Sequence, residues 1–191
     1  MKEVLILEGS PRKGGNTSVL LDAVGRGIAR AGGSLERIRV AELEVAPCLG
    51  CGGCDKTGLC VVKDEMQALY EKITAARRLI LASPIYFYAL TAQLKAVVDR
   101  GQALWSRKSL AQKAGSWRAD PERKGFLVAV AATRGERVFE GAILTAKYFF
   151  DAADFVYGGE LLVRGIDRRG EMKEDRESLD RAEQFGRQVL A

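Results

Sequence analysis

The chain lacks histidine altogether, and its cysteines are few and confined to one short segment. Among 191 residues there are 4 cysteines, all between positions 48 and 60. The absence of histidine excludes the Ser-His-Asp triad, the HExxH metalloprotease motif and zinc enzymes with histidine ligands. Any chemistry must therefore come from a cofactor, from cysteine, or from charged side chains.

The chain also lacks a long hydrophobic run and a block of charge of one sign. The apolar run within MKEVLILEGS is too short for a signal peptide and has no cleavage site behind it, and no other run approaches membrane-spanning length. We therefore expect a cytoplasmic protein without a membrane partner. The net charge is +5, but acidic and basic residues alternate, so we expect no nucleic-acid partner. A modestly basic cleft suits acidic small molecules such as nucleotides.

Apolar runs and amphipathic segments alternate along the chain, which is 47% hydrophobic and 29% charged. Length and composition predict one globular domain over residues 1–191. The expected strands are 4–7, 35–40, 78–83, 125–132 and 155–163. The central runs are apolar without interruption, which predicts an α/β fold: a three-layer, doubly wound sheet of five parallel strands. One long helix is expected across Leu94–Trp105, and the polar stretch 107–124 is interpreted as an insertion.

The first strand-to-helix turn, GSPRKGGNTS (9–18), is the first candidate binding site, because ligands of such sheets lie beyond the carboxyl ends of the strands. It is neither a Walker A loop nor a GxGxxG loop. It places the hydroxyl and amide groups of Ser10, Asn16, Thr17 and Ser18 at a helix N-terminus, where an anion is favoured. The terminal phosphate of a mononucleotide fits this loop. The alternative is that Asn16, Thr17 and Ser18 only cap the helix.

Two further loops are expected at the same edge of the sheet, SPIYFYAL (83–90) and AATRGE (131–136). The three aromatic residues of the first loop follow a buried strand and a Ser-Pro turn, so they could line a slot for a flat ring. The alternative is ordinary core packing of at least one of them.

The four cysteines have the spacing Cys48-x2-Cys51-x2-Cys54-x5-Cys60 in a glycine-rich loop over 46–62. Consecutive x2 gaps let one tight loop wrap a cubane cluster, whereas zinc sites usually bring two C-x2-C pairs from separate segments. A reducing compartment disfavours disulfides. The alternative is that the thiols hold no metal and pack as small hydrophobic groups. No cysteine begins the Cys-x5-Arg pattern of a cysteine phosphatase.

Four segments together resemble the flavodoxin-like NADPH-dependent FMN reductase superfamily: GSPRKGGNTS, CLGCGGCDKTGLC, SPIYFYALTAQLKAVVDR and ATRGERVFEGAILTAKYFFD. The cysteine loop is similar to that of the iron-sulfur flavoproteins. The resemblance implies a strand order of 2-1-3-4-5 and a homodimer or higher homo-oligomer with the flavin site near the interface. It implies an FMN phosphate held by Ser10, Arg12, Asn16, Thr17 and Ser18, a flavin ring against Pro84, Ile85, Tyr86 and Phe87, and a third loop supplied by Thr133, Arg134 and Gly135.

The function expected from this resemblance is an NAD(P)H-dependent oxidoreductase that passes electrons through bound FMN from a small-molecule donor to an acceptor that the sequence does not name. Such a scheme needs no catalytic acid or base, which agrees with the lack of histidine. A 4Fe-4S cluster would be ligated by Cys48, Cys51, Cys54 and Cys60. The alternatives are an electron-transfer module reduced by protein partners, without its own reductase activity, and a nucleotide-binding regulator without redox function.

Overall fold

The computed structural model describes residues 4–191 and confirms a five-stranded, all-parallel sheet. The strands are β1 (Val4–Glu8), β2 (Leu35–Arg39), β3 (Arg78–Pro84), β4 (Lys124–Ala131) and β5 (Val156–Arg164). Their order across the sheet is β2-β1-β3-β4-β5, as expected for a flavodoxin-like fold. The direction of winding reverses at β1 and β3, so a ligand site is expected beyond the carboxyl ends of these two strands.

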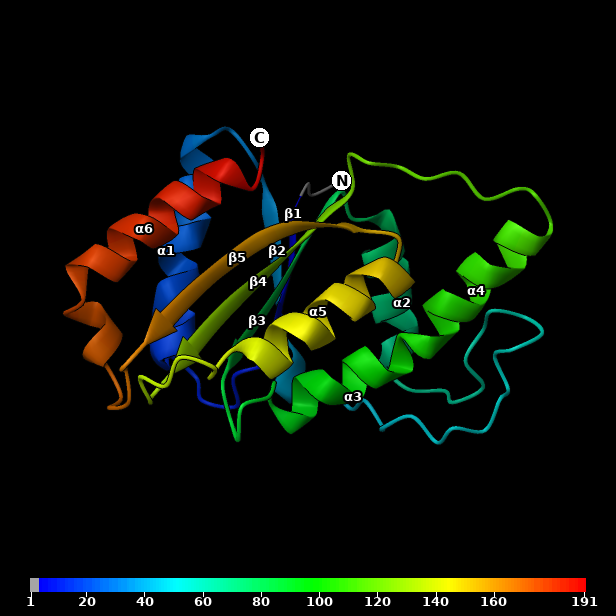
Figure 1. The fold of residues 1–191 in the computed structure, drawn as a ribbon, viewed down its shortest axis with the longest axis horizontal. Coiled ribbons are helices and arrows are strands. Elements are labelled where there is room, and N and C mark those ends of the chain that lie inside the picture. The colour runs from blue at the N-terminus through cyan, green and yellow to red at the C-terminus, as the bar shows by residue number, and fades with distance from the viewer. Residues whose placement is uncertain (1–3) are drawn as a thin grey trace.

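Helices cover both faces of the sheet (Figure 1). They are α1 (Asn16–Arg30), α2 (Met66–Ala75), α3 (Ala92–Arg100), α4 (Gln102–Lys113), α5 (Glu140–Ala152) and α6 (Arg176–Gln188), with the short 3-10 helices η1 (Val40–Glu42) and η2 (Glu171–Lys173). The pair α1 and α6 lies on one face, and α2, α3, α4 and α5 lie on the other. This is the predicted three-layer arrangement.

Alternate residues of each strand enter the two cores, because successive side chains of a strand point to opposite faces. In β1, Val4 and Ile6 pack with α1 and α6, whereas Leu5 and Leu7 pack with the helices of the other face. All four side chains are buried. The uninterrupted apolar run of β1 therefore reflects burial on both sides of the sheet.

The long helix expected across Leu94–Trp105 is two helices, α3 and α4, that meet at Gly101. A Cβ atom at Gly101 would lie 2.8 Å from the carbonyl oxygen of Val98 and 2.9 Å from the ring of Phe149 in α5. The glycine thus permits a close approach of α5 at the break. Helix α4 continues to Lys113 and so includes the first part of the stretch 107–124.

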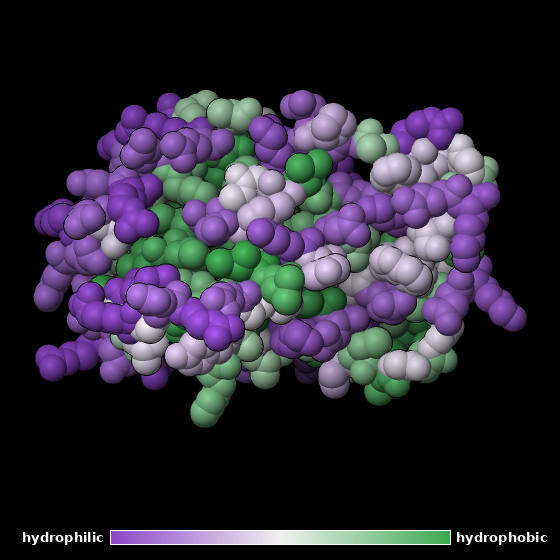
Figure 2. Space-filling view, viewed as in Figure 1, coloured by the Kyte–Doolittle hydropathy of each residue, from purple (hydrophilic) through white to green (hydrophobic). Residues whose placement is uncertain are grey.

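In the view of Figure 2, hydrophilic residues cover most of the face, and hydrophobic residues show mainly in its middle, between the helical layers. Within residues 4–191, no helix is both long and apolar enough to cross a lipid bilayer.

Candidate functional site

A pocket of about 100 Å³ lies beyond the carboxyl ends of β1, β3 and β4. It joins two of the segments singled out in the sequence. The predicted site residues that line it are Ser10, Arg12, Asn16, Thr17, Pro84, Ile85 and Tyr86. The first turn and the turn after β3 therefore form one site at the point where the sheet reverses its winding.

Among residues 4–191, no side chain caps the N-terminus of α1. Its N-cap is Gly15, and no side chain accepts a hydrogen bond there, so the capping alternative for Asn16, Thr17 and Ser18 does not describe this helix. The first backbone N–H groups of an uncapped helix, with the positive end of its dipole, favour an anion. Ser10 and Thr17 are buried beside this end, which suits a single phosphate group.

One of the predicted phosphate ligands, Ser18, uses its side chain elsewhere. The Ser18 hydroxyl donates to Oε1 of Glu8 at 2.5 Å, and Glu8 is fully buried at the end of β1. The guanidinium of Arg37 donates to the other oxygen of Glu8, with its Nε at 2.9 Å, and Arg39 lies 3.4 Å from the first oxygen. The Ser18 hydroxyl therefore joins α1 to the end of β1, and Ser18 does not line the pocket.

The turn after β3 divides its aromatic residues between the pocket and solvent. Tyr86 and Ala89 exchange two backbone hydrogen bonds of 3.0 Å each. The two residues between them, Phe87 and Tyr88, have φ values of +49° and +62°, as in a type I′ turn. Phe87 is fully exposed and does not line the pocket, so the turn brings Tyr86 to the pocket and directs Phe87 away from it.

The loop after β4 contributes less than expected. Ala132 lines the pocket, whereas Thr133, Arg134 and Gly135 do not. The guanidinium of Arg134 lies against Gly165, where a Cβ atom would come within 2.6 Å of its Cζ.

The sequence reasoning missed three pocket residues from the segment after β5, namely Ile166, Asp167 and Arg169. The signal that could have found this segment is the charged run DRRGE (167–171), which begins three residues after the end of β5. It was overlooked because only the first, third and fourth strand ends were expected to meet.

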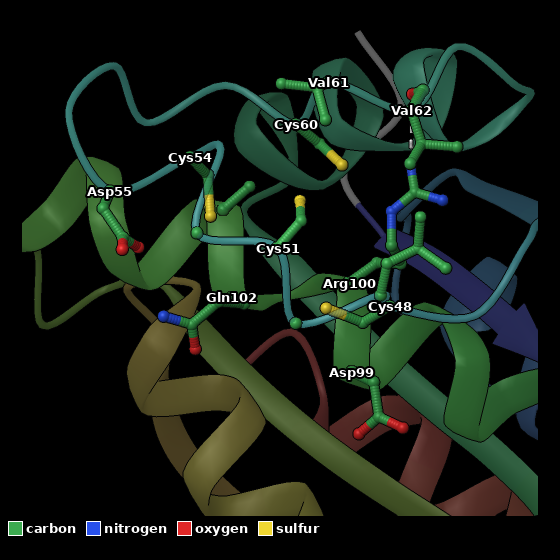
Figure 3. A pocket seen from close by; sticks show the side chains of 14 residues that line it. Cys48, Cys51, Cys54, Asp55, Cys60, Val61, Val62, Asp99, Arg100 and Gln102 are labelled. Atoms are coloured by element: carbon green, nitrogen blue, oxygen red, sulfur yellow. Dashed lines mark hydrogen bonds between the residues drawn. The ribbon is translucent and has the colours of Figure 1, made fainter.

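The four cysteines line a second cavity of about 500 Å³. Figure 3 shows the thiols of Cys48, Cys51, Cys54 and Cys60 around the same hollow, which Arg100 reaches from the end of α3. All four are free, and no three His, Cys, Asp or Glu side chains within residues 4–191 converge tightly enough to hold a single metal ion. The cavity lining offers four thiols, the donor set that a 4Fe-4S cluster takes.

Arg100 anchors both ends of the cysteine loop. Its Nη1 donates to the carbonyl oxygen of Ala46 at 3.0 Å, and its Nη2 donates to that of Val62 at 3.3 Å. Nη1 also donates to Oδ2 of Asp64 at 2.8 Å. The Nε of Arg100 is buried without an acceptor in the described chain.

Burial and hydrogen bonding have opposite effects on the pKa values of Asp64 and Arg100. Burial alone would raise the pKa of Asp64, but hydrogen bonds from Arg100 and from the N–H groups of Ala46 and Met66 outweigh it, so the pKa is lowered. Burial alone would lower the pKa of Arg100, but its contacts with Asp64 and Tyr70 raise it. Burial raises the pKa of Tyr70 to about 12. The ion pair is therefore fully charged at neutral pH.

Residues 2–150 match the family described as NADPH-dependent FMN reductase. The chain is 39% identical over 115 residues to an iron-sulfur flavoprotein of Archaeoglobus fulgidus, a match that covers 60% of this chain and 52% of the relative. It is 39% identical over 107 residues to an iron-sulfur flavoprotein of Methanosarcina thermophila, which covers 56% of each chain. The matches thus span about half the length of these relatives.

The fold is also similar to solved structures. One is RosB with the bound intermediate 8-demethyl-8-formylriboflavin-5'-phosphate, with a TM-score of 0.65 and 17% sequence identity. The similarity covers 100% of this chain and 79% of RosB. At this level of identity the likeness shows the flavodoxin-like fold alone.

Proposed function

The chain belongs to the NADPH-dependent FMN reductase family, and we propose that it is an NAD(P)H-dependent oxidoreductase that holds FMN in the pocket between the first turn and the turn after β3. The observation that carries the proposal is the joining of an uncapped helix N-terminus to a Pro-Ile-Tyr wall in one pocket. An anionic tail and a planar ring need these two surfaces side by side.

The roles of the residues follow from their chemistry. Ser10, Thr17 and the N–H groups at the start of α1 bind the phosphate, and Arg12 adds positive charge at the rim of the pocket. Pro84, Ile85 and Tyr86 form the wall against which the ring lies. FMN supplies hydride acceptance and one- or two-electron transfer when it is bound, while the protein orients it and excludes water. Because FMN supplies the redox chemistry, the protein needs no histidine for this function.

The test is steady-state oxidation of NADPH and of NADH by the FMN-loaded protein, measured with an excess of a quinone or free flavin as acceptor. Turnover well above that of free FMN at the same concentration is expected. The apoprotein is the control. Tight FMN binding with turnover no faster than free FMN would contradict reductase activity and would favour a carrier reduced by protein partners. Failure to bind FMN would contradict the whole proposal.

For the second cavity, we propose that Cys48, Cys51, Cys54 and Cys60 hold a 4Fe-4S cluster. Four free thiols on one hollow support it. Such a cluster would supply one-electron transfer. The free thiols also support the proposal of a reducing, cytoplasmic location.

Iron and sulfide assays on anaerobically purified protein, with an absorbance spectrum of the same sample, test the cluster. We expect Cys60→Ala to abolish iron binding and Thr57→Val, in the same loop, to retain it. Flavin absorbance bands in a sample without iron would contradict the cluster proposal and would leave the FMN proposal intact.

A homodimer is proposed on the face formed by α4 and α5. Trp105 is 48% exposed and Tyr148 is 72% exposed, and both line a groove of about 480 Å³ between these helices. Large exposed aromatic residues are typical of the centres of protein interfaces. Sedimentation velocity should report a dimer for the wild type and a monomer for Tyr148→Glu. A monomeric wild type at micromolar concentration would contradict the proposal.

A further inference from the structure

The segment after β5, residues 166–173, folds over the first turn; we call it the closing segment. It begins two residues after the end of β5, at Ile166, and includes η2. Its residues Ile166, Asp167 and Arg169 line the same pocket as Ser10 and Arg12. The family match ends at residue 150, so the shared family features do not assign this segment a role.

We propose that the closing segment is the second wall of the phosphate site, in which Arg169 binds the phosphate and Asn16 fixes the segment in place. The inference rests on the proposed FMN function and extends it to a part of the chain outside the family match. Its consequence is selectivity: the site distinguishes a phosphorylated flavin from the same ring and ribityl chain without a phosphate.

Asn16 joins the first turn to the closing segment through three hydrogen bonds. Its Nδ2 donates to the carbonyl oxygen of Arg168 at 2.8 Å. Its Oδ1 accepts from the backbone N–H groups of Gly170 and Met172, at 3.1 and 3.3 Å. An amide that already makes three such bonds has one donor hydrogen left. Asn16 is therefore a positioning residue in this structure and holds the wall by its side chain.

The closing segment is well ordered by its own contacts. The carboxylate of Glu171 accepts hydrogen bonds from the backbone N–H groups of Asp167 and Arg168, at 2.8 and 2.9 Å. Gly170 has a φ of +91°, a left-handed conformation that glycine adopts without steric cost. Met172 is fully buried in the core between α1 and α6. These contacts fix the backbone on both sides of Arg169.

Arg169 is the cation that the segment brings to the pocket. Its Nη2 donates to the carbonyl oxygen of Lys13 in the first turn at 3.2 Å, which leaves further N–H donors of the guanidinium for a ligand. The Lys13 ammonium itself pairs with Glu42 at 2.9 Å. Arg12 and Arg169 together outweigh the single carboxylate of Asp167 among the charged residues lining the pocket. Guanidinium groups bind phosphate oxygens with directed, charge-assisted hydrogen bonds.

The experiment compares FMN with riboflavin on the apoprotein of the full chain, by quenching of flavin fluorescence. We expect Arg169→Gln to weaken FMN binding by about tenfold and to leave riboflavin binding unchanged, since only FMN carries the phosphate. The matched control is Arg168→Gln. Arg168 is the neighbouring arginine, does not line the pocket, and contributes its backbone to the contacts above. It should leave both affinities unchanged.

Equal FMN affinity in Arg169→Gln and the wild type, or an equal loss for both ligands, would overturn the role of Arg169. If the wild type bound FMN and riboflavin with equal affinity, the closing segment would not bind the phosphate, but the pocket would still be a flavin site. A wild type that binds neither ligand would overturn both this inference and the proposed function. The three failures are thus distinguishable in one set of titrations.

A second variant separates positioning by Asn16 from direct binding. Asn16→Ala should speed amide hydrogen exchange at Gly170 and Met172 by at least about tenfold, because both N–H groups lose their acceptor. FMN affinity should fall in parallel. Weaker FMN binding with unchanged exchange at these two amides would mean that Asn16 binds the phosphate itself, and would overturn the positioning role.

Discussion

Arg100 and Asp64 form a bidentate ion pair at the base of the cysteine loop. Nη1 of Arg100 lies 2.8 Å from Oδ2 of Asp64, and Nη2 lies 3.2 Å from Oδ1. The side chains are 1% and 13% exposed. Because the same guanidinium also donates to the carbonyl oxygens of Ala46 and Val62, one residue of α3 closes the loop at both ends.

We predict that Arg100→Gln lowers the free energy of unfolding by about 3 kcal/mol, because it leaves Asp64 and two loop carbonyls without their charged partner. Urea denaturation measures the change. The control is Arg137→Gln, which removes an ion pair with Glu140 whose side chains are 80% and 58% exposed. It should cost less than about 0.5 kcal/mol. Similar small losses in both variants would contradict the anchoring role of Arg100.

The lowered pKa of Asp64 predicts that its contribution to the stability of the fold is lost at acid pH. A carboxyl whose pKa is lower in the folded chain stabilises the fold above its unfolded pKa, here near 3.8, and loses that contribution as the pH falls through the folded value. The stability difference between the wild type and Asp64→Asn should therefore be constant from about pH 5 to about pH 8 and should shrink below about pH 3.8.

Denaturation across this pH range measures that difference. Asp99→Asn is the control, because Asp99 is a half-exposed partner of Lys95 and its removal should cost little stability. A stability difference that persists undiminished below pH 3 would show that Asp64 does not act through its charge.

The sheet and the general position of the site were predictable because they depend on local patterns. The apolar runs that become β1, β3 and β4 are buried on both faces, so they stand out from the helical segments. The glycine-rich turn before α1 and the aromatic turn after β3 each follow a strand directly, and parallel strands bring such turns to one edge.

The break at Gly101 and the closing segment were not predictable in this way, because each depends on a contact with a distant part of the chain. Gly101 interrupts a helical pattern that looks continuous, and it lies where the ring of Phe149 on another helix leaves no room for a Cβ atom. Arg169 belongs to a charged run that reads as solvent-exposed, and contacts with the first turn, including the hydrogen bonds of Asn16, hold it at the pocket. Ser18 turns away for a similar reason, its bond to the buried Glu8.

The close crossing of α1 and α6 predicts that adding one methyl group at Gly27 strongly destabilises the fold. A Cβ atom at Gly27 would lie 2.0 Å from the carbonyl oxygen of Glu183, a backbone atom that cannot move without displacing α6. We expect Gly27→Ala to lower the free energy of unfolding by about 2 kcal/mol, measured by urea denaturation.

Gly25, on the same helix, provides the matched control. A Cβ atom there would meet only the end of the Leu35 side chain, at 3.2 Å. Gly25→Ala should be neutral or should stabilise the protein by about 0.5 kcal/mol, because alanine favours the helix over glycine. Equal losses of unfolding free energy in Gly27→Ala and Gly25→Ala would mean that the close approach of α6 does not exclude a side chain at position 27.

The turn at Phe87 predicts a substitution that stabilises the protein at the edge of its site. Phe87 has a φ of +49°, and a left-handed conformation costs a residue with a Cβ atom roughly 1–2 kcal/mol. Glycine avoids that cost and loses part of the gain to its freedom in the unfolded chain. Phe87→Gly should therefore raise the free energy of unfolding by about 0.5 kcal/mol.

The control for this variant is Phe87→Ala, which keeps the Cβ atom. Because the Phe87 side chain is fully exposed, neither variant loses packing within the chain, and Phe87→Ala should be close to the wild type in stability. The difference between the two variants, measured by chemical denaturation, isolates the backbone cost. If glycine and alanine gave the same stability, the aromatic turn would carry no strain, and backbone strain would not explain the conformation that brings Tyr86 to the pocket.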